Sequence, residues 1–330
     1  MRLRLRFILA ALVLTASAAG GSHAGPASDG APSVVLVTSD CANRDFICPA
    51  FVRAAARTGT RARIVAPDRR EDPVGVFELL AEQGHDLVIG DPEFGFDLLE
   101  AANRHPAQRF AVIDVPLPLA RPRPPNVAAL ELRPREAAYL AGWLAARMER
   151  RRPGPDVVGA VGGVRIEPVD EFIIGFRAGA RRASPEVRVL IGYSGDFADP
   201  TRCSAIAHRQ IAEGAGTVLD VAGGCGPGTL EAARRTGVWA IGVDLDRSGL
   251  GPHILTSVLK RYDRGFAALM RQAGSERLPA GRSIVLGLRR GGAELGRISH
   301  RVPAPVLHEL AAVRHLLATD RIRVPGPSYD

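Results

Sequence analysis

Short apolar segments alternate with segments of helical periodicity from residue 33 to about residue 260. The apolar segments, rich in Val and Ile, predict strands at 33–38, 62–66, 86–90, 110–113, 157–161, 187–193, 217–221, 238–243, 254–257 and 283–288. The periodic segments predict helices at 50–58, 73–83, 94–104, 135–150, 169–182, 203–213, 229–235, 258–272 and 306–317. Strands that alternate with helices in this way indicate an α/β fold whose parallel sheets are covered on both faces.

A proline-rich segment at 116–125, which can form neither a helix nor a central strand, interrupts the alternation. The pattern then restarts, so we expect two doubly wound parallel-sheet lobes. Past Asp244 the pattern is less regular, with a hairpin before the last helix and a final returning segment. The first lobe is expected to hold residues 33–128 and 250–282, and the second lobe residues 129–249 and 283–330, joined by a multi-strand hinge.

The N-terminal segment has the features of a secretory signal peptide, to which we assign residues 1–24. Three arginines precede the apolar run Phe7–Ala16, which is shorter than the roughly 20 residues that a membrane-spanning helix needs. Cleavage is expected after Ala18 or after Ala24, and no cysteine lies near either site. We therefore expect a periplasmic or extracellular protein without a lipid anchor.

The formal charge of +8 is weak evidence for nucleic-acid binding, because three of the positive charges lie in the expected signal peptide. The remaining basic residues are spread along the chain and are arginines, with Lys260 the only lysine. A nucleic-acid surface needs clustered charge, so no nucleic-acid partner is expected. The mature chain of about 300 residues is long enough for two domains with their own cores.

The four cysteines are Cys41, Cys48, Cys203 and Cys225. An even number in an oxidising compartment favours disulfides, and of the three possible pairings we prefer the local one, Cys41–Cys48 with Cys203–Cys225. The alternative is four free buried thiols. Their spacings match no zinc signature, so no metal site is expected.

Enzyme signatures are sparse, since the chain has neither a Gly-x-Ser-x-Gly nor a His-Glu-x-x-His motif. The glycine-rich loop 223–228 lacks the Lys-Ser/Thr ending of a nucleotide-phosphate loop. No catalytic residue and no cofactor are expected. In open parallel sheets, ligands bind beyond the carboxyl ends of the strands. The residues at or just after such ends are Asp40, Gly90, Asp114, Gly163, Phe197, Gly223 and Asp244.

Several motifs together resemble the basic-membrane-protein family of solute-binding proteins, which includes purine-nucleoside receptors of bacterial ABC importers. They are the segments 136–142, 159–163, 172–179, 195–200, 222–226, 239–246 and 255–260. The resemblance covers nearly the whole mature chain and implies a type I periplasmic-binding fold. It also implies a receptor that closes on a nucleoside or nucleobase and passes it to a membrane permease, and we expect the protein to be a monomer.

The resemblance implies that two phenylalanines, Phe46 and Phe197, stack on the two faces of a heterocyclic base. The alternative for Phe46 is a contact between a helix and the sheet. Polar contacts to the ligand are implied for Asp40, Asp114, Asp244 and Lys260. The alternative for Lys260 is a surface position on the helix expected at 258–272.

The first motif departs from the family pattern, because Ile47 stands where the family has asparagine. Asn43 and Asp45 are the candidates to replace that polar contact. The ligand therefore stays open among a nucleoside, a nucleobase and another flat polar molecule. Two further functions remain as alternatives: a periplasmic sensory subunit, and an exported enzyme that processes nucleosides on the same fold.

Overall fold

The structure is a computed structural model that describes residues 30–39, 41, 46–68, 70–114, 124–275 and 281–326. The chain divides into two compact units, Met1–Leu130 with Phe266–Ile284 and Glu131–Gly265 with Val285–Asp330. The chain therefore passes from one unit to the other three times. The expected signal peptide and residues 116–123 of the proline-rich segment lie outside the described residues.

The first unit contains a six-stranded sheet in the order β11-β5-β4-β3-β1-β2. Its elements are β1 (Ser33–Val37), α1 (Ile47–Thr58), β2 (Arg61–Val65), α2 (Pro73–Glu82), β3 (Leu87–Gly90), η1 (Pro92–Phe94), α3 (Gly95–Arg104) and β4 (Phe110–Ile113). Three further elements, β5 (Val127–Leu132), α8 (Tyr262–Ala273) and β11 (Ser283–Leu286), belong to it in part, because the chain passes between the units within them. Strands β1 to β5 pair in parallel, so their carboxyl ends share one edge of the sheet.

The second unit contains a six-stranded sheet in the order β12-β10-β9-β8-β6-β7. Its elements are α4 (Arg135–Glu149), β6 (Val157–Gly162), α5 (Glu167–Ala183), β7 (Arg188–Tyr193), α6 (Pro200–Ala212), β8 (Thr217–Val221), η3 (Gly223–Cys225), α7 (Pro227–Thr236), β9 (Trp239–Asp244), η4 (Ser248–Leu250), β10 (Ile254–Lys260), β12 (Ala293–Leu295) and α9 (Ala304–Ala318). Strands β6 to β10 are parallel and β12 runs antiparallel to β10.

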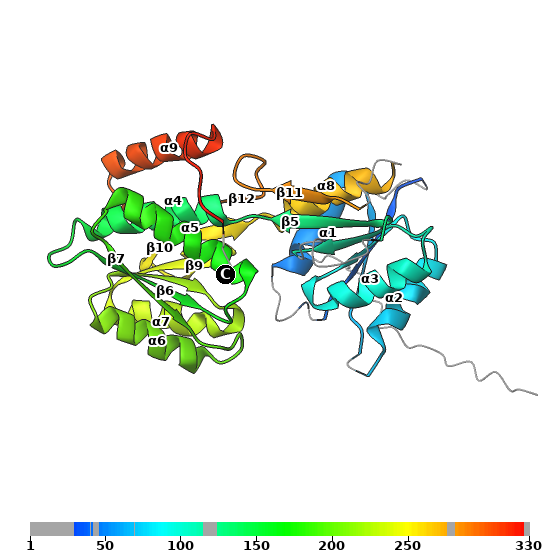
Figure 1. The fold of residues 1–330 in the computed structure, drawn as a ribbon, viewed down its shortest axis with the longest axis horizontal. Coiled ribbons are helices and arrows are strands. Elements are labelled where there is room, and N and C mark those ends of the chain that lie inside the picture. Colours follow the sequence, from blue (N-terminus) through cyan, green and yellow to red (C-terminus); the bar gives the residue numbers. More distant parts are fainter. Residues whose placement is uncertain are drawn as a thin grey trace, which may run out of the picture. The chain divides into compact units, whose positions relative to one another are not determined.

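The two sheets have the same order, with β6 to β10 taking the places of β1 to β5. In the second unit, α4 and α5 cover one face of the sheet, α6 and α7 cover the other, and α9 packs outside α4 (Figure 1). The buried faces of α4, α5 and α9 share one core with apolar residues of the central strands, and buried residues of α6 and α7 belong to separate clusters. This is the doubly wound arrangement that the alternating pattern predicts, so the expected α/β fold is confirmed.

Helices α4 and α5 approach each other through three glycines. A Cβ at Gly142 would lie 1.9 Å from the carbonyl oxygen of Phe176, and one at Gly179 would lie 1.9 Å from that of Tyr139. At Gly175 the corresponding distance to the Arg135 carbonyl oxygen is 2.2 Å. Side chains of any size would push the backbones apart. The motifs at 136–142 and 172–179 therefore encode a close helix–helix contact in this unit.

The structure corrects three expectations about the C-terminal third. Residues 258–260 continue β10, because Val258, Leu259 and Lys260 pair with β12 and β9, so the helix expected from residue 258 begins only at Tyr262. The expected hairpin does not form, since β11 joins the first sheet and β12 the second. Strand β5, which the sequence pattern does not predict, belongs to the first sheet.

The division of the chain also differs from the expected lobes at residues 250–265. They were expected in the first lobe, whereas β10 lies between β9 and β12 in the second sheet. The pairing of Lys260 with Ala293 fixes the end of β10 there. Among the described residues, no helix is long and apolar enough to cross a membrane.

Candidate functional site

Phe197 is an exposed aromatic side chain at the carboxyl edge of the second sheet. It lies in the loop between β7 and α6, and 39% of its surface is exposed. Its ring fills the space beside Gly163, where an added Cβ would lie only 2.4 Å from ring carbons. A Cβ at Gly223 would lie 3.6 Å from the same ring. The two glycines at neighbouring strand ends thus form the surface on which the ring rests.

The loop that carries Phe197 is braced by its neighbours. The Phe197 carbonyl accepts a hydrogen bond of 2.9 Å from the Cys225 N–H. The disulfide Cys203–Cys225 ties α6 to η3, which confirms the expected pairing. Both cysteines are fully buried. The loops after β7 and β8 are therefore held together, and Phe197 is presented on a constrained backbone.

Lys260 is the last residue of β10 and is buried, with 8% of its surface exposed. The interpretation as a surface residue on a helix is therefore wrong. Its Nζ lies 5.7 Å from the centre of the Phe172 ring and 5.9 Å from that of Tyr262, which is within cation–π range.

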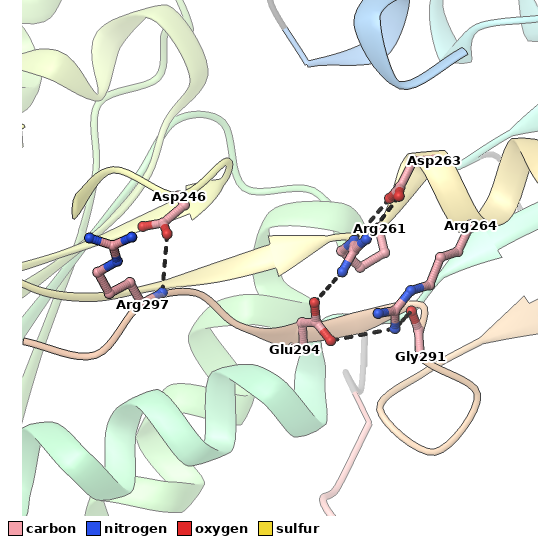
Figure 2. Close-up of polar contacts among 7 residues, drawn as sticks. All are labelled: Asp246, Arg261, Asp263, Arg264, Gly291, Glu294 and Arg297. Carbon is pink, nitrogen blue, oxygen red and sulfur yellow. Dashed lines mark hydrogen bonds and ion pairs between the residues drawn. The ribbon is translucent and has the colours of Figure 1, made fainter. Parts of the chain in front are cut away.

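The residue after Lys260 is the centre of an ion-pair network. The Arg261 guanidinium donates two hydrogen bonds to Asp263, of 2.9 and 2.8 Å, and a third to Glu294 (Figure 2). Arg264 also pairs with Glu294, at 3.4 Å. These partners join the end of β10 to the start of α8 and to β12. The residue next to Lys260 is therefore bonded both to α8, through Asp263, and to β12, through Glu294.

Asp114 and Asp244 occupy equivalent positions in the two units, at the ends of β4 and β9. Both have left-handed backbone conformations, with φ of 54° and 65°. Such conformations are uncommon outside glycine, and aspartate and asparagine tolerate them better than other residues do. The same backbone feature thus recurs at the equivalent strand end of each unit, and the roles of the two carboxylates stay a prediction.

At the carboxyl edge of the first sheet, Thr38 Oγ1 donates a hydrogen bond of 2.7 Å to Asp91, whose side chain is fully buried. Phe46 is half-buried and precedes α1 as its N-cap. The disulfide Cys41–Cys48 encloses this segment and confirms the second expected pairing. Asp40 and Asn43 lie outside the described residues.

The structure thus groups the expected residues by unit. In the second unit, Phe197 and Gly223 are in contact range, and Asp244 and Lys260 end neighbouring strands, with Asp244 paired to Leu259. In the first unit, Asp114 follows β4 on the edge where β1 and β3 also end. In the described part of the chain, no group of three or more His, Cys, Asp or Glu could hold a metal ion.

Asp220 was not among the residues expected from the sequence. It lies in β8, is 6% exposed, and accepts a hydrogen bond of 3.1 Å from the Ala222 N–H. Burial raises the pKa of Asp220 to about 7, Asp244 adds to the rise, and the positive charge of Arg247 opposes it. The sequence does carry a signal for this residue, because Asp220 is a charged residue inside the otherwise apolar run 217–221.

We expect Asp220→Asn to be more stable than the wild type above pH 7 and to lose that advantage near pH 4. The folded protein keeps the Asp220 proton up to about pH 7, whereas the unfolded chain loses it near pH 4. Between these values the unfolded state binds fewer protons. The free energy of unfolding of the wild type therefore falls as pH rises, by at most about 1.4 kcal/mol per pH unit.

Urea titrations of both proteins at several pH values from about 4 to above 7 measure the difference. The advantage of the amide variant should grow with pH and level off above about pH 7. Parallel pH profiles for the two proteins would show that Asp220 does not titrate in this range.

The fold and the arrangement of strand ends are those of type I periplasmic-binding proteins. A solute-binding protein of an ABC transporter system from Aeropyrum pernix K1 superposes with a TM-score of 0.76 and 21% identity, over 90% of this chain and 94% of that chain. A second solute-binding protein of an ABC transporter system, from Conexibacter woesei DSM 14684, superposes with a TM-score of 0.69 and 25% identity. The match covers 90% of this chain and 99% of that chain. A transcriptional activator of the comK gene from Bacillus halodurans superposes with a TM-score of 0.76 and 18% identity, over 89% of this chain and 99% of that chain. The fold therefore also occurs in a regulator.

Residues 52–326 match the Bmp family model, described as ABC transporter substrate-binding protein PnrA-like, and the chain belongs to this family of solute-binding proteins. The nucleoside-binding protein BmpA of an ABC transporter from Lactococcus lactis is 27% identical over 65% of this chain and 64% of its own length. Basic membrane protein A of Borreliella burgdorferi is 32% identical over 57% of this chain and 55% of its own length. The chain thus matches less than two thirds of the length of these two relatives.

Proposed function

We propose that the protein is an exported solute-binding protein that closes on a flat, polar heterocycle, with a purine nucleoside or nucleobase as the best candidate, and delivers it to the permease of an ABC importer. The proposed ligand-binding residues are Asp40, Asn43, Phe46, Asp114, Phe197, Gly223, Asp244 and Lys260.

The observation that carries this proposal is the exposed ring of Phe197. An aromatic side chain that rests on glycines at the carboxyl edge of a parallel sheet presents a flat apolar face where such folds bind ligands. Stacking of a base on an aromatic ring contributes about 1–3 kcal/mol and tolerates different bases. Phe46 is proposed to supply the second face.

The polar groups at the strand ends suit a ligand with hydroxyl and amino groups. Carboxylates such as Asp114 and Asp244 accept hydrogen bonds from these groups. Lys260 is the only lysine of the chain and is largely buried, and its ammonium group can donate to ribose oxygens. The relative from Lactococcus lactis that is named a nucleoside-binding protein supports the same class of ligand.

Export is supported by the two disulfides, because such bonds persist in oxidising compartments. Delivery requires that the ligand favour the closed state over the open one, since equal affinity for both states would not drive closure. A permease can then distinguish the loaded protein from the empty one.

A thermal-shift screen against nucleosides, nucleobases and related heterocycles tests this function. A ligand present at 100 times its dissociation constant adds about 2.7 kcal/mol to the free energy of unfolding. We expect at least one purine compound to raise the melting temperature, with stoichiometric binding in calorimetry. If no heterocycle raises it, the proposed ligand class is wrong. Chromatography of the same samples separates binding from turnover, since release of free base would indicate the enzyme alternative.

A further inference from the structure

Four arginines line a pocket of the second unit that belongs to none of the sites above. The pocket has a volume of about 490 Å³ and lies between the start of α4, the turn after β11 and the loop after α9. Its walls contain Arg133, Arg135, Arg289 and Arg290, with Glu136 and Asp320 as the acidic residues. The lining residues carry four positive and two negative charges, and two further carboxylates, Glu131 and Glu171, pair with the arginines from outside the lining.

The arginines differ in how well they are neutralised. Arg133 pairs with Glu131 at 3.0 Å, and Arg135 pairs with the largely buried Glu171 at 3.5 Å. Arg290 has no ion pair among the residues that the structure describes, and its Nη1 donates only a 3.5 Å hydrogen bond to the Val285 carbonyl.

The two carboxylates of the lining are already engaged. Glu136 accepts a hydrogen bond of 3.0 Å from the Leu288 N–H, and Asp320 forms an ion pair with Arg289. Arg289 and Asp320 are both more than half exposed, at 54% and 56% of their side-chain surfaces. The donors of Arg290 thus face a pocket in which the acidic groups have other partners.

We propose that this pocket binds a small oxyanion of the phosphate type, either free phosphate or the phosphate of a larger molecule. Planar guanidinium groups donate two parallel hydrogen bonds to such oxygens, and several arginines around one concave space share the charge of a dianion. Arg290 is the primary ligand, and Arg133 and Arg289 complete the site. This site is independent of the proposed solute function.

The test is calorimetric titration of the mature protein with inorganic phosphate in low-salt buffer. We expect one saturable site, and we expect Arg290→Gln to weaken it by at least about tenfold, because a charge-assisted hydrogen bond is lost. Asp320→Asn removes a competing carboxylate from Arg289 and should strengthen binding several-fold. Asparagine also tolerates the left-handed backbone of Asp320, whose φ is 57°.

The matched control is Arg151→Gln, which changes an exposed turn arginine outside the pocket and should leave binding unchanged. A gain of affinity in Asp320→Asn cannot come from misfolding, so it separates the site from a general loss of structure. Competition by phosphatidylglycerol vesicles would identify a lipid headgroup as the anion, and an unaffected isotherm would identify the free ion. Absence of saturable binding, or equal weakening in Arg151→Gln, would overturn the proposal.

Discussion

Gly179→Ala is expected to lower the free energy of unfolding by about 3 kcal/mol or more. Its Cβ would lie 1.9 Å from the carbonyl oxygen of Tyr139 and 2.7 Å from the carbonyl carbon. Backbone atoms cannot rotate away as a flexible side chain can, so α4 and α5 would have to separate. Alanine's better helix propensity, about 1 kcal/mol over glycine, offsets only part of this cost.

Urea unfolding followed by circular dichroism measures the effect. Gly249→Ala is the control, because a Cβ there meets no atom within 4 Å. It should change the free energy of unfolding by no more than about 0.5 kcal/mol. Equal stability of Gly179→Ala and the wild type would show that the two helices can move apart without cost.

Phe197→Ala is expected to weaken binding of the screened ligand by roughly tenfold to a hundredfold, because one stacking face is removed. The ring is 39% exposed and rests on glycines, so its loss should change the free energy of unfolding far less than the loss of a buried phenylalanine, which costs about 3–5 kcal/mol. Calorimetry of ligand binding and urea unfolding on the same preparation separate the two effects.

Leu307→Ala provides the matched control, since Leu307 is 38% exposed on α9, outside the proposed site. This variant should keep the affinity of the wild type. If Phe197→Ala loses stability and affinity in equal proportion, Phe197 is a core residue and the stacking role is wrong.

Most of the parallel-sheet framework could be predicted from the sequence, because strands buried on both faces are continuous apolar runs. The prediction failed where tertiary pairing overrides local pattern. Residues 258–260 continue a helical periodicity, yet pairing with β9 and β12 keeps them in β10. Strand β5 follows a proline-rich segment and carries a glutamate, so its short apolar run does not stand out as a strand.

The strand-end residues of the candidate site could be predicted from the sequence, whereas the residues that pack against them or pair with their neighbours could not. The rule that ligands bind beyond strand ends locates Asp114, Phe197 and Asp244. Nothing local in the sequence indicates that Gly163 makes room for the Phe197 ring, since that contact joins residues far apart in the chain. The same holds for Glu294 beside Arg261, a pair separated by 33 residues.

The three passages of the chain between the units have a consequence for the order in which the protein is made. The first unit is incomplete when residue 130 leaves the ribosome, because α8 and β11 are still missing. Phe51 of α1 packs edge-on against Phe266, and the Ala129 N–H bonds to the Arg282 carbonyl. The N-terminal strands therefore lack α8 and β11 until residues 266–284, and with them residues 131–265 of the second unit, have been synthesised.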